Sequence, residues 1–195
     1  PTRRSSDLPR DPAALPRTLA YLDALEAQGR YTLMVWPVHC EVGTWGHQLH
    51  DAVRDACADW ELRRQRASHV VHKGLNPWTE HYSALQAEVP DPADPETGLN
   101  RALIARLDTP GRLLIAGEAG SHCVRATVEH LVANLPDPTP ERLSRLTLLT
   151  DAISPVGGFE AQQAAFFDDM RQRGVRLATC AEVLAEMTAM TETKA

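Results

Sequence analysis

The sequence predicts an α/β protein of three layers, in which helices cover both faces of a mostly parallel sheet. Short apolar runs alternate with amphipathic segments along the chain, and this alternation is typical of parallel strands joined by helices. One stretch contains the whole unit: the apolar run Leu113–Ala116 leads through small residues into a helical pattern. A chain of 195 residues is also long enough to bury a substantial core.

The elements follow in order from their spacing. Leu19, Leu22 and Leu25 predict a helix from Pro16 to Gln28, which Gly29 ends. Up to the apolar run we expect a strand at Tyr31–Trp36, a loop at Pro37–Gly46, a helix from His47 to about Arg66, a strand at Ser68–Lys73, a loop over Gly74–Glu96 with a short helix near Glu80–Leu85, and a helix at Leu99–Leu107. Beyond it we expect a strand at Leu146–Thr150, a helix at Glu160–Arg173, a strand at Val175–Ala178 and a helix at Ala181–Met187.

Cys123 lies in the first turn of a predicted helix, just past the carboxyl end of a predicted strand. Gly117, Ala119 and Gly120 allow the backbone to turn sharply, and Ser121 is the predicted N-cap. The free N–H groups and partial positive charge of a helix N-terminus favour a thiolate. Open α/β sheets also bind ligands at this edge. We therefore interpret Cys123 as a nucleophile; the alternative is a small buried thiol.

Lys73 lies at the end of another predicted strand. The chain has 20 basic residues, and Lys73 and Lys194 are its two lysines. In a chain that otherwise uses Arg, a Lys at this edge indicates a need for a compact ammonium that can release its proton. Beside a thiolate it would stabilise negative charge. The alternative is an ordinary surface lysine.

Three histidines are weaker candidates. His39 follows the predicted strand at Tyr31–Trp36, so it belongs to the same sheet edge, although a lone His is more often structural. His47 and His50 lie three residues apart at a helix start. They could pair on a metal, but we interpret them mainly as a polar helix face.

Composition excludes several classes of function. The net charge of −6 gives no electrostatic basis for binding nucleic acid or an anionic membrane. No apolar run approaches the length of a membrane span. The four cysteines form no CxxC pair, and such scattered thiols indicate a reduced, cytoplasmic protein.

Four blocks then carry a family resemblance. They are Trp36–Gly46, His72–Ala84, Ala116–Thr127 and Asp151–Glu160, and together they cover about residues 30–180. With these blocks in this order, the chain resembles the cysteine hydrolases of the isochorismatase-like superfamily, particularly nicotinamidases and related amidases. The resemblance implies that superfamily's α/β/α fold.

The resemblance also implies site residues. It implies a triad of Asp, Lys and Cys, of which Lys73 and Cys123 match two members. It implies a cis peptide at Glu118–Ala119, and an oxyanion hole formed by the N–H groups of Ala119 and Cys123. It implies a divalent metal (Zn, Fe or Mn) in the full-length protein, with His39 as one ligand. Trp78 and Tyr82 could line the substrate pocket, or pack as ordinary loop residues.

The implied activity is hydrolysis of a small, nicotinamide-like amide through a Cys123 thioester. Isochorismatases share the fold but cleave a vinyl ether without needing the Cys. A non-catalytic binding protein on the same fold and a metal-dependent hydrolase centred on His39, His47 and His50 are further alternatives. We expect a small-molecule substrate as the partner and leave a homo-oligomer open.

The Asp-x-Gln-x-Asp-Phe type motif that supplies the family's Asp is absent from the sequence. Residues 1–8 resemble a translated sequencing adapter. We therefore expect residues 1–8 to be a non-native or disordered tail, residues 9–190 to form an isochorismatase-like domain without its first strand, and residues 191–195 to be a disordered tail. On this expectation the printed chain is an inactive fragment.

Overall fold

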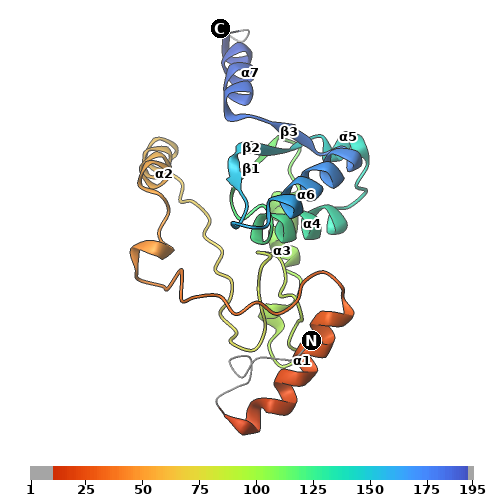
Figure 1. Cartoon of the computed structure of the whole chain (residues 1–195). Helices are drawn as coiled ribbons and strands as arrows, with labels where there is room; N and C mark the ends of the chain where they lie inside the picture. The colour runs from red at the N-terminus through yellow and green to blue at the C-terminus, as the bar shows by residue number, and fades with distance from the viewer. Residues whose placement is uncertain (1–10, 193–195) are drawn as a thin grey trace. The chain divides into compact units, whose positions relative to one another are not determined.

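The computed structural model describes residues 11–192 of the chain (Figure 1). The tail expected at residues 1–8 lies outside this part, and so do residues 193–195 of the tail expected at the other end. Residues 191 and 192 belong to the last helix. The chain divides into two compact units, one up to His72 and the other from Lys73 onward.

Within residues 11–72 the first unit has two helices and two short 3-10 turns. They are η2 (Pro12–Ala14), α1 (Leu15–Ala27), η3 (Trp45–His47) and α2 (Asp51–Arg64). Helix α1 confirms the sequence prediction, and it ends before Gly29, whose φ of +65° suits a glycine. Helix α2 begins four residues later than expected, because the ring of His50 caps it by accepting the N–H of Ala52.

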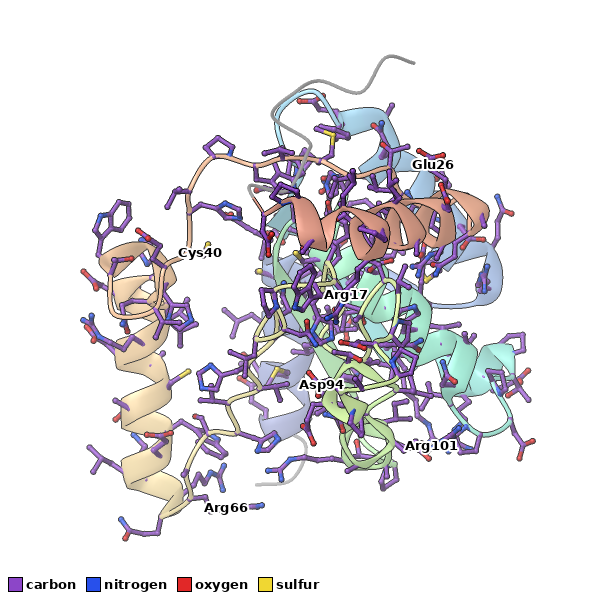
Figure 2. All side chains as sticks on the ribbon, turned by 90° about the horizontal axis from the view of Figure 1, so that it is seen from below. Arg17, Glu26, Cys40, Arg66, Asp94 and Arg101 are labelled. Carbon is purple, nitrogen blue, oxygen red and sulfur yellow. The ribbon has the colours of Figure 1, made fainter. Side chains whose placement is uncertain are left out.

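Helix α2 buries none of its residues. Figure 2 shows its side chains projecting on all sides, between the labelled Cys40 and Arg66 that flank it in the sequence. The apolar side chains of Val53, Trp60 and Leu62 are exposed. The sequence pattern that predicted a packed face on this helix therefore does not correspond to burial within the described residues.

Two predicted strands of the first unit are wrong. Residues 31–36 and 68–72 have irregular backbone, as does Lys73 at the start of the second unit. A strand exists only where a neighbour supplies hydrogen bonds, and no segment in residues 11–192 forms a ladder with either stretch. The β-branched and aromatic residues of both stretches favour an extended backbone locally, but a strand also needs a neighbouring strand to pair with.

The second unit contains a three-stranded parallel sheet. Strands β1 (Leu113–Glu118), β2 (Leu146–Ser154) and β3 (Arg176–Ala178) lie side by side in that order. Leu113 lies opposite Leu146, and Thr147 lies opposite Arg176. The register shifts between Ile115 and Gly117, close to the point where β1 enters the turn before Cys123.

Helices flank this sheet. They are α3 (Arg101–Leu107), α4 (Cys123–Asn134), α5 (Pro140–Leu143), α6 (Glu160–Arg173) and α7 (Cys180–Glu192), with the 3-10 turn η4 (Pro95–Thr97) before α3. Helices α4 and α6 lie on one side of the strands and α7 on the other (Figure 1), as right-handed crossovers between parallel strands require for α4 and α6. Leu148 of β2, Leu131 of α4 and Met170 of α6 are among the fully buried core side chains. The predicted α/β class with a parallel sheet is confirmed.

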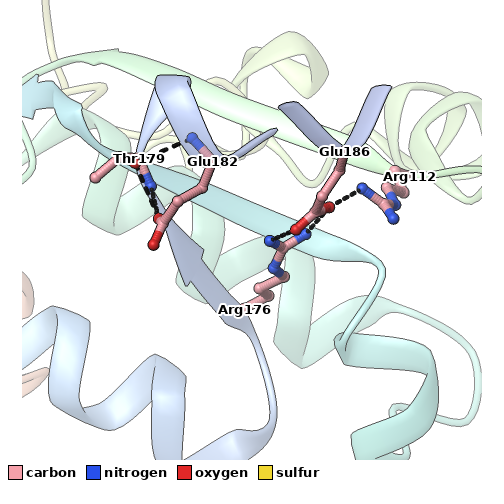
Figure 3. Close-up of polar contacts among 5 residues, drawn as sticks. All are labelled: Arg112, Arg176, Thr179, Glu182 and Glu186. Carbon is pink, nitrogen blue, oxygen red and sulfur yellow. Dashed lines mark hydrogen bonds and ion pairs between the residues drawn. The ribbon is translucent and has the colours of Figure 1, made fainter. Parts of the chain in front are cut away.

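Polar contacts attach α7 to the sheet (Figure 3). The Glu186 carboxylate accepts from Arg112 at 2.6 Å and from Nη1 of Arg176 at 2.9 Å, and also pairs with Nη2 of Arg176. At the start of the helix, Thr179 and Glu182 form a reciprocal capping box: the Glu182 carboxylate accepts the Thr179 N–H, and the Thr179 hydroxyl accepts the Glu182 N–H. Both sets of contacts fix the entry and the face of this helix.

The short helix expected near Glu80–Leu85 is absent. Long-range hydrogen bonds replace it, because the Glu80 carbonyl accepts the N–H of Glu88 and the Leu85 carbonyl accepts that of Asn100. These bonds fold residues 80–100 back on themselves. In residues 11–192 no helix has both the length and the apolar character needed to cross a bilayer.

Candidate active site

Lys73 and Cys123 meet in the second unit. The ammonium Nζ of Lys73 lies 3.5 Å from the sulfur of Cys123 and 2.9 Å from the carbonyl oxygen of His81. Lys73 is exposed and Cys123 is half-buried, so solvent reaches both groups. A thiol beside a fixed ammonium at a helix start is an arrangement in which a thiolate is stabilised by two sources of positive potential.

The turn between β1 and α4 positions the sulfur. It contains a cis peptide bond between Glu118 and Ala119, where the resemblance implies one. The Ala119 carbonyl accepts the N–H groups of His122 and Val124, and Gly120 donates to the Ser154 carbonyl of β2. The first residue of α4 is Cys123, so its side chain lies in the first turn of the helix.

Gly120 is a steric requirement of this turn. A Cβ built on it would lie 2.6 Å from Cγ2 of Ile153 and would also collide with the side-chain amide of Gln163. Backbone and two side chains therefore pack closely here, and only a residue without a Cβ fits. The small residue that the sequence suggested for a sharp turn is needed chiefly for this close approach.

The predicted capping role of Ser121 is wrong. His122 is the N-cap residue and makes no side-chain capping bond. The Ser121 hydroxyl is used elsewhere, because it accepts the N–H of Val156 at 3.0 Å and lies 2.9 Å from Nδ1 of His122. Both residues are buried. Ser121 thus connects the Cys123 turn to the loop after β2.

His122 lies between two aromatic rings. It packs edge-on against Phe159, with ring centroids 4.8 Å apart, and tilted against Tyr82 at 5.3 Å. Burial, and to a smaller extent the positive charge of Arg125, hold the pKa of His122 below its ordinary value. A neutral imidazole in this position joins three segments: the loop that follows Lys73, the Cys123 turn and the loop before α6.

A hydrogen bond from Ala84 to Thr127 attaches the segment after Lys73 to α4, and Thr127 bonds in turn to Cys123 within the helix. The Thr127 hydroxyl donates to the Cys123 carbonyl at 2.7 Å and accepts the N–H of Ala84 at 3.0 Å. Ser83, between Ala84 and Tyr82, is completely buried. Helix α4 therefore holds Ala84, three positions from His81, through Thr127.

His81 in turn holds the Lys73 ammonium and the backbone of the next residue, Gly74. Its carbonyl accepts from Nζ of Lys73, and its Nδ1 accepts the N–H of Gly74 at 3.2 Å. Burial, and secondarily the Lys73 ammonium, hold the pKa of His81 below its ordinary value. Since Nδ1 accepts, the neutral ring carries its proton on Nε2.

The other predicted site residues have different positions. Tyr82 is 5% exposed and packs in the core against His122, whereas Trp78 is 40% exposed. His39 is exposed, in the first unit, and its Nδ1 lies 2.6 Å from the Pro37 carbonyl. No group of three His, Cys, Asp or Glu side chains suited to a metal gathers within residues 11–192. The described residues therefore do not form the metal site that the resemblance implies.

Sequence reasoning missed His81, Ser121 as a connector, and Thr127. Thr127 had a usable signal, since a Thr four residues after the nucleophile on the same helix can donate to its carbonyl. The contacts of His81 and Ser121 depend on residues brought together by folding, so no local sequence pattern predicts them.

Comparisons with known proteins give similarity to solved structures. No family model and no curated protein matches the chain. The yeast nicotinamidase Pnc1p bound to the inhibitor nicotinaldehyde is 20% identical with a TM-score of 0.47, over 75% of this chain and 59% of its own. PnC1 from L. infantum in complex with nicotinate is 23% identical with a TM-score of 0.47, over 75% of this chain and 62% of its own. The pyrazinamidase of Pyrococcus horikoshii in complex with zinc is 19% identical with a TM-score of 0.43, over 88% of each chain.

The chain thus spans about three fifths of the length of the first two structures. All three are nicotinamidases or pyrazinamidases.

Proposed function

We propose that this chain carries the nucleophile and the ammonium of an amidase-type cysteine hydrolase of the nicotinamidase-related kind, an enzyme class that cleaves the C–N bond of a small, nicotinamide-like amide. The observation that carries the proposal is the 3.5 Å contact between Nζ of Lys73 and Sγ of Cys123. A surface lysine or a filler thiol would not need this contact, which joins two residues far apart in the sequence. Cys123 is the nucleophile and Lys73 stabilises its thiolate.

The chemistry follows from these groups. The Cys123 sulfur forms a bond to the amide carbon, and the carbonyl oxygen becomes an oxyanion. The N–H groups of Ala119 and Cys123 donate to that oxyanion; in residues 11–192 neither makes a backbone hydrogen bond outside regular helix or strand pairing. The C–N bond then breaks, ammonia leaves with a proton, and water hydrolyses the thioester to the acid. The resemblance implies that an Asp takes the Cys123 thiol proton and returns it to the leaving ammonia; the motif that would supply this Asp is absent from the sequence.

The attack step is therefore the step to test. Nicotinaldehyde has an electrophilic carbon and no leaving group, so addition of Cys123 would stop at a thiohemiacetal. We expect nicotinaldehyde to protect Cys123, and not Cys180, from iodoacetamide, as measured by mass spectrometry of the peptides. Lys73→Ala should lose most of this protection.

Equal protection of Cys180, or no protection of either thiol, would contradict the nucleophile assignment. A Cys123→Ala variant that binds nicotinaldehyde as tightly as the wild type would indicate the non-catalytic binding protein instead. Trp78, which is exposed on the loop after Lys73, is the residue we propose to contact the ring of the substrate. Trp78→Ala should therefore weaken protection by nicotinaldehyde more than protection by acetaldehyde.

A further inference from the structure

We infer that His81 is a positioning residue, which sets the Lys73 ammonium at the Cys123 sulfur through the two hydrogen bonds that it accepts. The inference rests on the proposed function only in taking Cys123 as the reactive thiol. Its evidence is the arrangement of residues 73–84 and the first turn of α4.

His81 holds the Lys73 segment at two points. The carbonyl of His81 accepts from Nζ of Lys73 at 2.9 Å, and its ring accepts from the Gly74 backbone at 3.2 Å. One residue therefore fixes the far end of the lysine side chain and the backbone next to its Cα. A lysine side chain has many rotamers, so two anchors at its ends favour one placement of Nζ over many.

A chain of contacts joins His81 indirectly to Cys123. Ala84 donates to Thr127, and Thr127 donates to the Cys123 carbonyl. Tyr82 and Ser83, which separate His81 from Ala84, are buried. The path from the nucleophile to its ammonium thus runs from α4 through residues 82–84 to His81, and then to Lys73.

The bond to Gly74 also depends on the protonation state of the His81 ring. Only a neutral His81 can accept the Gly74 N–H at Nδ1. Its Nε2 is buried and has no hydrogen-bond partner within residues 11–192. Charging the ring would bring an N–H at Nδ1 against the N–H of Gly74, so the neutral form is the one that holds Gly74.

The experiment separates the acceptor from the ring. His81→Asn keeps a short acceptor near the position of Nδ1 and loses the ring, whereas His81→Phe keeps a ring and loses the acceptor. The rate of Cys123 alkylation by iodoacetamide is measured across pH by peptide mass spectrometry. We expect His81→Phe to slow alkylation at neutral pH about tenfold, as loss of a nearby ammonium would, and to raise the pH at which the rate is half its plateau.

We expect His81→Asn to keep the wild-type profile. In a Lys73→Ala background, neither change should alter the rate further, because His81 acts through Lys73. Thr79→Val is the matched control, since it removes a hydrogen bond to the Val89 carbonyl from the same loop and should leave the profile unchanged.

A role in packing alone predicts the reverse order, with Phe harmless and Asn damaging. That order overturns the inference, as does a His81→Asn profile that matches Lys73→Ala, even if His81→Phe does not fold. The readout needs no amide substrate, so failure of nicotinaldehyde to protect Cys123 would reject the proposed function without affecting this result.

Discussion

The ammonium of Lys73 lies 3.5 Å from the sulfur of Cys123, although the two residues are 50 positions apart in the sequence. The two residues lie in different parts of the fold: Lys73 lies in irregular backbone and Cys123 begins α4. Their contact is maintained by two uncharged groups. The His81 carbonyl accepts from the Lys73 ammonium, and the Thr127 hydroxyl donates to the Cys123 carbonyl. The pair is thus a product of the loop between them as much as of the helix.

The first prediction concerns the relative reactivity of the thiols. Cys40 and Cys180 are exposed, while Cys123 is half-buried, so access alone would favour the first two. Asp151 raises the pKa of Cys180 further. We nevertheless expect iodoacetamide to label Cys123 fastest at neutral pH, because the thiolate is the reacting form and Lys73 stabilises it. Faster labelling of Cys40 than of Cys123 would refute this.

The second prediction concerns Lys73 itself. Lys73→Arg should lower the alkylation rate of Cys123 nearly as much as Lys73→Ala. The planar guanidinium is larger than an ammonium and cannot donate to the His81 carbonyl and face the sulfur from the same point. If Lys73→Arg keeps the wild-type rate, the residue supplies only positive charge. Arg106→Lys, at an exposed helix position, controls for the exchange of basic residues.

The third prediction concerns the turn before the nucleophile. Gly120→Ala should destabilise the protein by about 1–3 kcal/mol, since the new methyl must displace Ile153 or Gln163. It should also slow Cys123 alkylation, because the displaced turn carries the sulfur away from Lys73. Gly157→Ala is the control: its Cβ would meet nothing within 4 Å. Urea denaturation and labelling of both variants check the prediction.

How far sequence reasoning reached depended on how local each feature is. The helix predicted from about Glu160 to Arg173 is confirmed, and it ends before Gly174, whose φ of +101° suits a glycine. Helix α1 and the start of α4 at Cys123 also follow local spacing. The strand β2 extends to Ser154, four residues past its predicted end, through pairing with β1 that no local pattern reports.

Most of the failures are features that need a distant partner. Residues 31–36 have strand-forming side chains but no ladder among the described residues. The helix near Glu80–Leu85 gave way to hydrogen bonds with Glu88 and Asn100. At the site, Lys73 and Cys123 were predicted from residue type and context. His81, whose role consists of bonds to Gly74 and Lys73 in the folded chain, left no such signal.

The fourth prediction concerns stability in mild acid. Burial lowers the pKa of both His81 and His122, while an unfolded His titrates near pH 6.5. Below about pH 6.5 the unfolded chain therefore binds more protons than the folded one, and the free energy of unfolding falls as the pH falls through the lowered folded values. Urea midpoints at pH 7.5 and 5.5 should differ accordingly. His122→Gln should reduce that difference, and exposed His69→Gln should not.

The fifth prediction concerns the attachment of α7. Glu186 is the common partner of Arg112 and Arg176 (Figure 3), so Glu186→Gln leaves two like charges side by side without their anion. We expect faster amide hydrogen exchange in residues 180–192 and a lower Tm. The loss should diminish at high salt, because the three side chains are partly exposed and screened.

The same carboxylate gives this attachment a pH dependence. Arg176, and then Arg112, lower the pKa of Glu186, so its contribution is present above the ordinary Glu value of about 4.3 and is lost as the pH falls through the lowered one. Asp168→Asn is the control, because the exposed Asp168–Arg171 pair lies within one helix and joins no two elements. Unchanged exchange in Glu186→Gln would mean that Val183, which is buried, and the Thr179–Glu182 capping box hold α7 without the ion pairs.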